Sequence, residues 1–124
     1  MEKKILLIIV EDDNMFRDLM TMKLNLENFN VIEAADGEEG IKKIKEEKPD
    51  LVLLDVMLPG VDGFGVLEAI KKDPSLSKIK VFFLSNFDTK EDIEKGMKLG
   101  ATDYLIKSQN TPADIIDKVK DALK

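Results

Sequence analysis

Five polar side chains each follow an apolar run of the sequence, and their chemical types suit phosphate chemistry. Glu11 and Asp12 follow ILLIIV, Asp55 follows LVLL, Ser85 follows VFFL and Lys107 follows YLI. Each run has the length and composition of a strand that is buried on both faces of a parallel sheet. Ligands of such sheets bind beyond the carboxyl ends of the strands, so we expect the five side chains to converge there.

Three of these side chains are carboxylates, which predicts a site for a hard cation. Burial of Asp55 beside Glu11 and Asp12 is unfavourable unless a cation or a proton compensates the charge. The chain has no Cys and no His, and a donor set made only of oxygen suits Mg2+. The alternative interpretation is that acids favour helix N-termini; it accounts for Asp13 but not for Asp55.

The remaining groups fit phosphoryl transfer, which requires an in-line nucleophile and neutralisation of the charge on phosphoryl oxygens. Asp55 is a nucleophile that is ionised at neutral pH without a base. Lys107 supplies a compact positive charge and Ser85 a hydroxyl donor. A lone Ser or Lys at a strand end is most often a polar rim residue, so the hypothesis depends on the whole set.

The elements that must position this site alternate along the chain. Period and composition predict strands at Lys4–Val10, Val31–Ala34, Leu51–Leu54, Ile79–Leu84 and Thr102–Ile106. They predict helices at Asn14–Glu27, Glu38–Glu47, Phe64–Lys71, Lys90–Leu99 and Pro112–Leu123. Strands that alternate with helices of this length indicate right-handed crossovers and a parallel sheet.

Capping signals support several of these boundaries. Thr111 before Pro112 is typical of an N-cap followed by proline at the first helical position. Asp36 and Glu39 have the spacing of a capping box. Gly100 stands where the fourth helix needs a residue in the left-handed conformation.

Length and composition limit the function classes. A chain of 124 residues suits one domain over residues 1–124. The absence of Cys and His excludes disulfides, thiolate metal sites and histidine chemistry. A net charge of −6, with basic residues scattered among acids, disfavours direct nucleic-acid binding. The apolar runs are too short for a membrane span and no signal peptide precedes them, so we expect a cytoplasmic protein.

Four motifs together resemble the receiver domain of two-component response regulators. They are VEDD at 10–13, LLDVMLPGVDG at 53–63, FLSN at 83–86 and DYLIK at 103–107, and the resemblance covers essentially the whole chain. Each motif is weak alone, whereas their order and spacing are highly specific. The resemblance implies a flavodoxin-like (βα)5 fold with a parallel sheet of order 2-1-3-4-5 and helices on both faces.

The resemblance also implies roles for the acidic residues. Asp55 matches the phosphoacceptor, which receives a phosphoryl group from the phosphohistidine of a sensor kinase or a phosphotransfer protein. Asp12 and Asp55 match direct Mg2+ ligands, Glu11 a ligand through water, and Met57 the donor of a backbone carbonyl.

The same resemblance implies a switch and an output surface. Ser85 matches the switch hydroxyl, Lys107 the site lysine, and Tyr104 the aromatic residue that turns inward when the hydroxyl moves. The alternative for Tyr104 is a half-buried tyrosine of an edge strand. The family's output surface corresponds to residues 90–123, which would contact an effector or an output domain outside this chain. Phosphorylation-dependent dimerisation is left open.

Two residues beside the site depart from what is common in that family, and two others stand at positions that flank the approach of water. Ser108 follows Lys107 where proline after a cis peptide is usual, and a cis bond before serine costs about 2.5–4 kcal/mol, so we expect a trans peptide or strain. Asn86 replaces a small residue beside the switch hydroxyl. Met57 and Phe87 are apolar where a polar group would orient an attacking water, which predicts slow self-dephosphorylation.

The sequence thus favours a phosphorylation-controlled signalling switch over a turnover enzyme. One alternative keeps the fold as a protein-binding module that does not use phosphorylation, with Asn86 and Ser108 as its support. Another is a hydrolase with an aspartyl-phosphate intermediate. Such phosphatases typically carry a second acid two residues after the nucleophile, where this chain has Met57.

Overall fold

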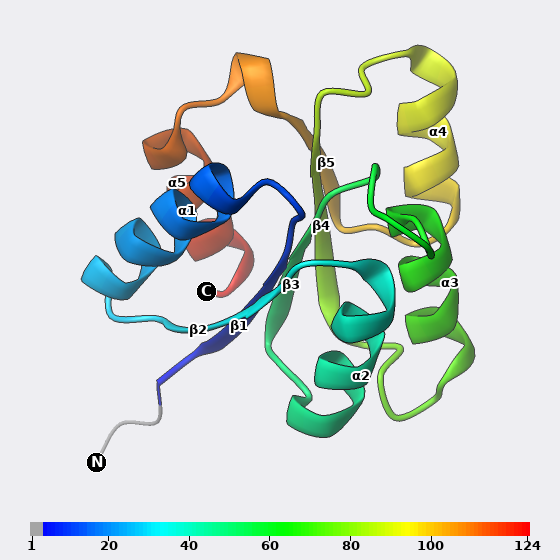
Figure 1. Cartoon of the computed structure of the whole chain (residues 1–124), viewed down its shortest axis with the longest axis horizontal. Coiled ribbons are helices and arrows are strands. Elements are labelled where there is room, and N and C mark those ends of the chain that lie inside the picture. The colour runs from blue at the N-terminus through cyan, green and yellow to red at the C-terminus, as the bar shows by residue number, and fades with distance from the viewer. Residues whose placement is uncertain (1–3) are drawn as a thin grey trace.

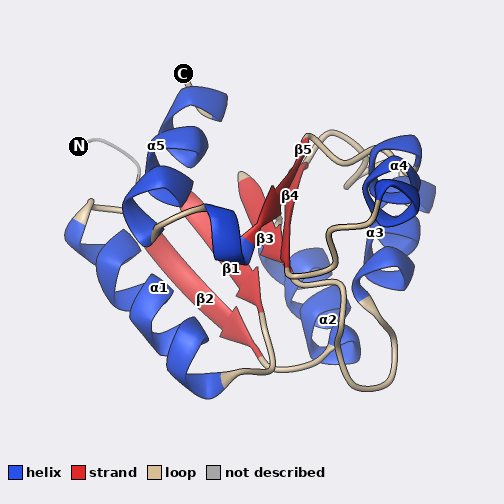
Figure 2. Ribbon diagram, turned by 90° about the horizontal axis from the view of Figure 1, so that it is seen from above, coloured by secondary structure: helices blue, strands red, loops and turns tan. Residues whose placement is uncertain are grey.

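A computed structural model describes residues 4–124 as one parallel sheet with helices on both faces (Figures 1 and 2). The strands are β1 Leu6–Val10, β2 Asn30–Ala34, β3 Leu51–Leu54, β4 Lys80–Ser85 and β5 Asp103–Ile106. The helices are α1 Asn14–Leu26, α2 Gly37–Glu47, α3 Gly63–Lys72, α4 Lys90–Lys98 and α5 Pro112–Ala122. The strand order β2-β1-β3-β4-β5 confirms the predicted topology.

The sheet is buried on both faces because β1 and β3 are apolar at every position and β4 is apolar from Val81 to Leu84. Successive side chains of a strand point to opposite faces. Ile8 and Val10 of β1 accordingly pack into the core beneath α2, α3 and α4. Leu7 and Ile9 pack into the second core with residues of α1 and α5. These two helices cover the other face of the sheet (Figure 2). No helix among residues 4–124 is long and apolar enough to cross a membrane.

The predicted helix caps are present, with one difference. The Thr111 side chain accepts a hydrogen bond from the Asp114 amide, and Asp114 accepts one from the Thr111 amide, which completes a capping box. The Asp36 side chain caps α2, but the Glu39 carboxylate accepts from the Ala35 amide instead of returning to Asp36. Gly100 has φ +105°, as its place after α4 requires.

Two of the expected site residues lie within elements to which the sequence did not assign them. Ser85 is the last residue of β4, because the ladder continues to the pair Ser85 and Ile106. Lys107 begins a short 3-10 helix over Lys107–Gln109 that the sequence did not predict. β1 begins two residues later than predicted, at Leu6, and the other boundaries differ by one residue at most.

The loop after β3 is held against the sheet by a close approach of Gly63. The Gly63 amide donates to the Val56 carbonyl over 2.8 Å. A Cβ atom at this glycine would lie 2.1 Å from the backbone carbonyl oxygen of Asp55. The absence of a side chain at position 63 therefore sets the path of the chain on both sides of Asp55.

We predict that Gly63→Ala destabilises the fold by about 2–4 kcal/mol, since a backbone atom must move to make room. Gly65→Ala in the same helix is the matched control, because its Cβ would lie 2.8 Å from the Val61 side chain and 3.6 Å from Asp62 Oδ1, neither of which is a backbone atom. The Val61 side chain can move, and alanine favours the helix by about 1 kcal/mol. Urea unfolding at neutral pH measures both, and equal stability changes would contradict the prediction.

Candidate functional site

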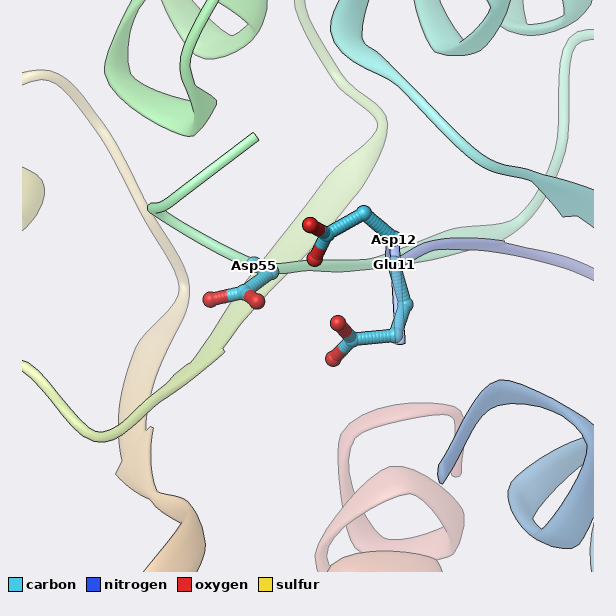
Figure 3. A group of neighbouring side chains, drawn as sticks. All are labelled: Glu11, Asp12 and Asp55. Carbon is cyan, nitrogen blue, oxygen red and sulfur yellow. The ribbon is translucent and has the colours of Figure 1, made fainter. Parts of the chain in front are cut away.

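The predicted acidic cluster forms at the carboxyl edge of the sheet. Glu11 directly follows β1 and Asp55 directly follows β3, and these strands are neighbours with Val10 paired to Leu54. Asp12 comes from the same connection as Glu11. Glu11, Asp12 and Asp55 each offer a carboxylate oxygen, and these oxygens lie within 4.8 Å of one another. Figure 3 shows the three carboxylates around one point.

Lys107 reaches this cluster from the other side of β4. Its Nζ donates to Glu11 Oε1 and, over 3.2 Å, to Asp55 Oδ2. Burial disfavours the ammonium form, but the hydrogen bond to Glu11 and the charge of Asp55 outweigh it. The pKa of Lys107 is therefore raised above its ordinary value. The lysine holds a positive charge at the carboxylates over the whole physiological range.

Glu11 is the most buried carboxylate of the cluster, with 2% of its surface exposed. Burial raises its pKa from the ordinary 4.5 to about 7, with the hydrogen bond from Lys107 opposing and the charge of Asp55 adding to the increase. Its second oxygen accepts from the Asp13 amide over 3.1 Å. Glu11 thus has both oxygens engaged and is oriented toward the cluster.

The cluster fits a divalent hard cation. Mg2+ binds oxygen at about 2.0–2.1 Å and accepts a few carboxylates together with water. Oxygens within 4.8 Å of one another are near the spacing that this ion needs, and no softer donor is present among them. Glu11, Asp12 and Asp55 are the side chains that would hold it. The contribution of the Met57 carbonyl remains a prediction.

Ser85 and Tyr104 meet at one residue of the loop after β4. The Ser85 hydroxyl, which is buried, accepts from the Phe87 amide over 3.1 Å. The Tyr104 hydroxyl donates to the Phe87 carbonyl over 2.6 Å. The Tyr104 ring is buried against Phe83, with centroids 5.5 Å apart, and burial raises its pKa. Tyr104 is therefore an inward-facing core residue rather than a half-buried one.

Two residues near the site, Phe16 and Arg17, were not among those that the sequence predicted there. The Phe16 ring lies under Lys107, with Nζ 4.6 Å from the ring centroid, which adds a cation–π contact. Arg17 donates to the Glu11 carbonyl over 2.7 Å and pairs with Glu33 over 2.9 Å. Arg17 is the only arginine of the chain, and this feature of the sequence could have drawn attention to it. No feature of the sequence indicates that Phe16 contacts Lys107, which is 91 positions away.

The two departures from the family, Ser108 and Asn86, and the two apolar residues that flank the approach of water also have defined places. Residues 4–124 contain no cis peptide, so Lys107 and Ser108 are joined in trans. The Met57 side chain is 60% exposed, while Phe87 is half-buried against the core. Asn86 lies at the surface, and its carbonyl oxygen accepts from the Ser108 amide over 3.0 Å.

The raised pKa of Glu11 predicts a pH dependence of stability without metal. Between its ordinary pKa and about 7, native Glu11 keeps a proton that the unfolded chain has released. Stability should therefore fall as pH rises through this window, by about 1–2 kcal/mol. Urea unfolding with EDTA at about pH 5 and about pH 8 measures the difference. Glu11→Gln should lose this component and exposed Glu38→Gln should keep it, whereas an unchanged pH dependence in Glu11→Gln would contradict the assignment.

Sequence comparisons identify one family for nearly the whole chain. Residues 7–120 match the family model of the response regulator receiver domain. The chain is 37% identical over 124 residues to the alkaline phosphatase synthesis transcriptional regulatory protein PhoP of Bacillus subtilis, covering all of this chain and 50% of that protein. It is 38% identical over 101 residues to the transcriptional regulatory protein AfsQ1 of Streptomyces coelicolor, covering 82% of this chain and 44% of that protein.

The chain thus spans about half the length of these relatives. A solved structure shares the fold over a similar range: a CheY-like response regulator receiver domain protein from Methanospirillum hungatei has a TM-score of 0.89 and 30% identity. That alignment covers 98% of this chain and 94% of the other. This is a family of signalling domains, not of turnover enzymes. The chain belongs to the response regulator receiver domain family of two-component systems.

Proposed function

We propose that this chain is a phosphorylation-controlled switch in which Asp55 accepts a phosphoryl group from a histidine kinase or a phosphotransfer protein. One observation carries the proposal: Asp55 shares an edge of the sheet with two carboxylates while its own Oδ2 accepts a hydrogen bond from Lys107, at 3.2 Å. A nucleophile, a cation site and a fixed positive charge are the groups that phosphoryl transfer uses.

The proposed reaction needs no general base. An Asp55 carboxylate oxygen forms the new bond to phosphorus as the bond from phosphorus to the donor imidazole nitrogen breaks. The electron pair of that bond stays on the imidazole. Bound Mg2+ would neutralise charge on the phosphoryl oxygens. Lys107, already beside Asp55, would donate to one of those oxygens, and Ser85 would donate to another.

The Ser85 hydroxyl is the proposed start of the conformational signal. It accepts from the Phe87 amide, and the carbonyl of Phe87 accepts from Tyr104. If Ser85 turns toward a phosphoryl oxygen, both contacts of the loop after β4 must adjust. This loop leads directly into α4 and Tyr104 lies on β5, which supports an output surface over α4, β5 and α5.

The partners of this switch follow from the family and the charge. Receiver domains of two-component systems interact with histidine kinases, and relatives of this chain are transcriptional regulators. We propose an effector protein, or an output domain beyond this sequence, as the reader of the signal. The net charge of −6 argues against direct contact of this domain with nucleic acid. Its place of action in this proposal is the cytoplasm.

Asp55→Asn is predicted to abolish phosphorylation, because an amide is not a nucleophile for this reaction. The purified protein is incubated with acetyl phosphate and Mg2+, and its intact mass is recorded. We expect one phosphoryl group on the wild type, none with EDTA and none on Asp55→Asn. Asp117→Asn is the matched control, because Asp117 is an exposed acid on α5, and it should be phosphorylated like the wild type.

Equal phosphorylation of Asp55→Asn would contradict the role of Asp55. A wild type that takes up no phosphoryl group from acetyl phosphate or from a phosphorylated histidine kinase would favour the phosphorylation-independent binding module.

The phosphoryl group is predicted to persist for hours rather than seconds, since Met57 and Phe87 offer no polar group to an attacking water. The donor is removed and the decay is followed by intact mass. Met57 is 60% exposed, so Met57→Asn should shorten the lifetime several-fold by orienting water. Met97→Asn, at an exposed methionine of α4, is the control. Decay of the wild type within about a minute would refute this prediction.

A further inference from the structure

Asn86 and Ser108, the two residues that depart from the common pattern, contact each other. The Ser108 amide donates to Asn86 Oδ1 over 3.0 Å. The two residues are 22 positions apart, one in the loop after β4 and the other in the 3-10 helix after β5. The bond therefore joins two separate connections at the carboxyl edge of the sheet.

Both departures are needed for this bond. Proline has no amide hydrogen, so a proline at position 108 would remove the donor. Alanine or glycine at position 86 would remove the acceptor, because neither side chain carries a polar atom. The two unusual residues thus complete one interaction, which gives a physical reason for their occurrence in the same chain.

The bond lies next to Ser85 and Lys107, the two residues proposed to donate hydrogen bonds to the phosphoryl oxygens. Ser85 directly precedes Asn86, and Lys107 directly precedes Ser108. The last ladder pair between β4 and β5 is Ser85 with Ile106, so the bond continues the connection between the two strands past the end of the ladder. Loss of this bond would leave the segment after Ser85 without its hydrogen bond to the segment after Ile106.

The bond contributes little to global stability, because both residues are exposed. A net hydrogen bond of this kind is worth about 0.5–1.5 kcal/mol, and water competes for both groups at an exposed site. We expect the bond to affect the rate of phosphorylation more than the free energy of unfolding, since small displacements of catalytic groups reduce rates strongly.

We propose that Asn86 is a positioning residue: its side chain holds the Ser108 amide and thereby keeps Ser85 and Lys107 at the spacing that binds a phosphoryl group. This inference rests on the proposed phosphorylation of Asp55. It assigns to a side chain the positioning that a rigid proline would otherwise supply after the site lysine.

Asn86→Leu tests the role of the acceptor, because leucine has the same number of side-chain heavy atoms and the same branching but no polar atom. The rate of phosphorylation by acetyl phosphate with Mg2+ is measured by intact mass over a range of donor concentrations. We expect the maximal rate to fall about 3- to 10-fold, the span that loss of one net hydrogen bond predicts. The half-saturating donor concentration should stay the same, and beryllofluoride, a phosphoryl mimic, should bind more weakly to the same extent.

Three further variants separate this role from a merely structural one. Asn86→Asp keeps an acceptor and should lie closer to the wild type than Asn86→Leu. Ser108→Ala keeps the amide donor and should match the wild type. Asn25→Ala, at an exposed asparagine far along α1, is the control for substitution itself. Hydrogen exchange of the Ser108 amide should accelerate in Asn86→Leu and slow again in Asn86→Asp.

Equal maximal rates of the wild type and Asn86→Leu would overturn the role of Asn86 while leaving the proposed function intact. A parallel loss of Mg2+ affinity in Asn86→Leu would also overturn it, because the carboxylates would then have moved as well. A wild type that is not phosphorylated at all would overturn the proposed function, and this inference with it.

Discussion

The pairing of Lys107 with Glu11 and Asp55 is the interaction on which the site depends. Two buried carboxylates at neighbouring strand ends repel each other and lose hydration. The ammonium group of Lys107 offsets part of this cost. Burial and the charge of Asp55 still raise the pKa of Glu11, and the two carboxylates raise the pKa of Lys107. The residual negative charge of the cluster is what makes a divalent cation a favourable addition.

The parallel sheet is what makes this pairing possible. Glu11, Asp55 and Lys107 are far apart in sequence, but each follows a strand whose carboxyl end lies at the same edge. The two apolar cores on either face fix the register of the strands, since a slip of one residue would move each row of Leu, Ile or Phe side chains into the opposite core and disrupt the packing of both. The cost of that disruption holds the charged residues in place.

Around this centre, the loop after β4 links the site to the surface. Phe87 accepts from Tyr104 through its carbonyl and donates to Ser85 through its amide, while Asn86 reaches the connection after β5. A short loop with three such contacts can change position only by exchanging them. This is the physical basis for a change at Ser85 to reach α4 and β5.

The sheet, the residues at its strand ends and two of the helix caps could be predicted from the sequence alone. The apolar runs and the helical periods predicted a parallel sheet and the polar residue at each strand end, because burial on both faces leaves a strong pattern. The strand order was implied by the resemblance of the four motifs to receiver domains and not by the periodicity. The helix caps at Thr111 and Gly100 followed from local chemistry, which depends only on neighbouring residues.

Contacts between side chains that are distant in the sequence became visible only in the folded structure. Only the fold could pair Lys107 with the Phe16 ring, turn Tyr104 inward, or place the Asn86 side chain on the Ser108 amide. It also extended β4 to Ser85 and began a 3-10 helix at Lys107. Such contacts leave no periodic signal in a sequence, because each is made between residues whose spacing along the chain is unrelated to their distance in space.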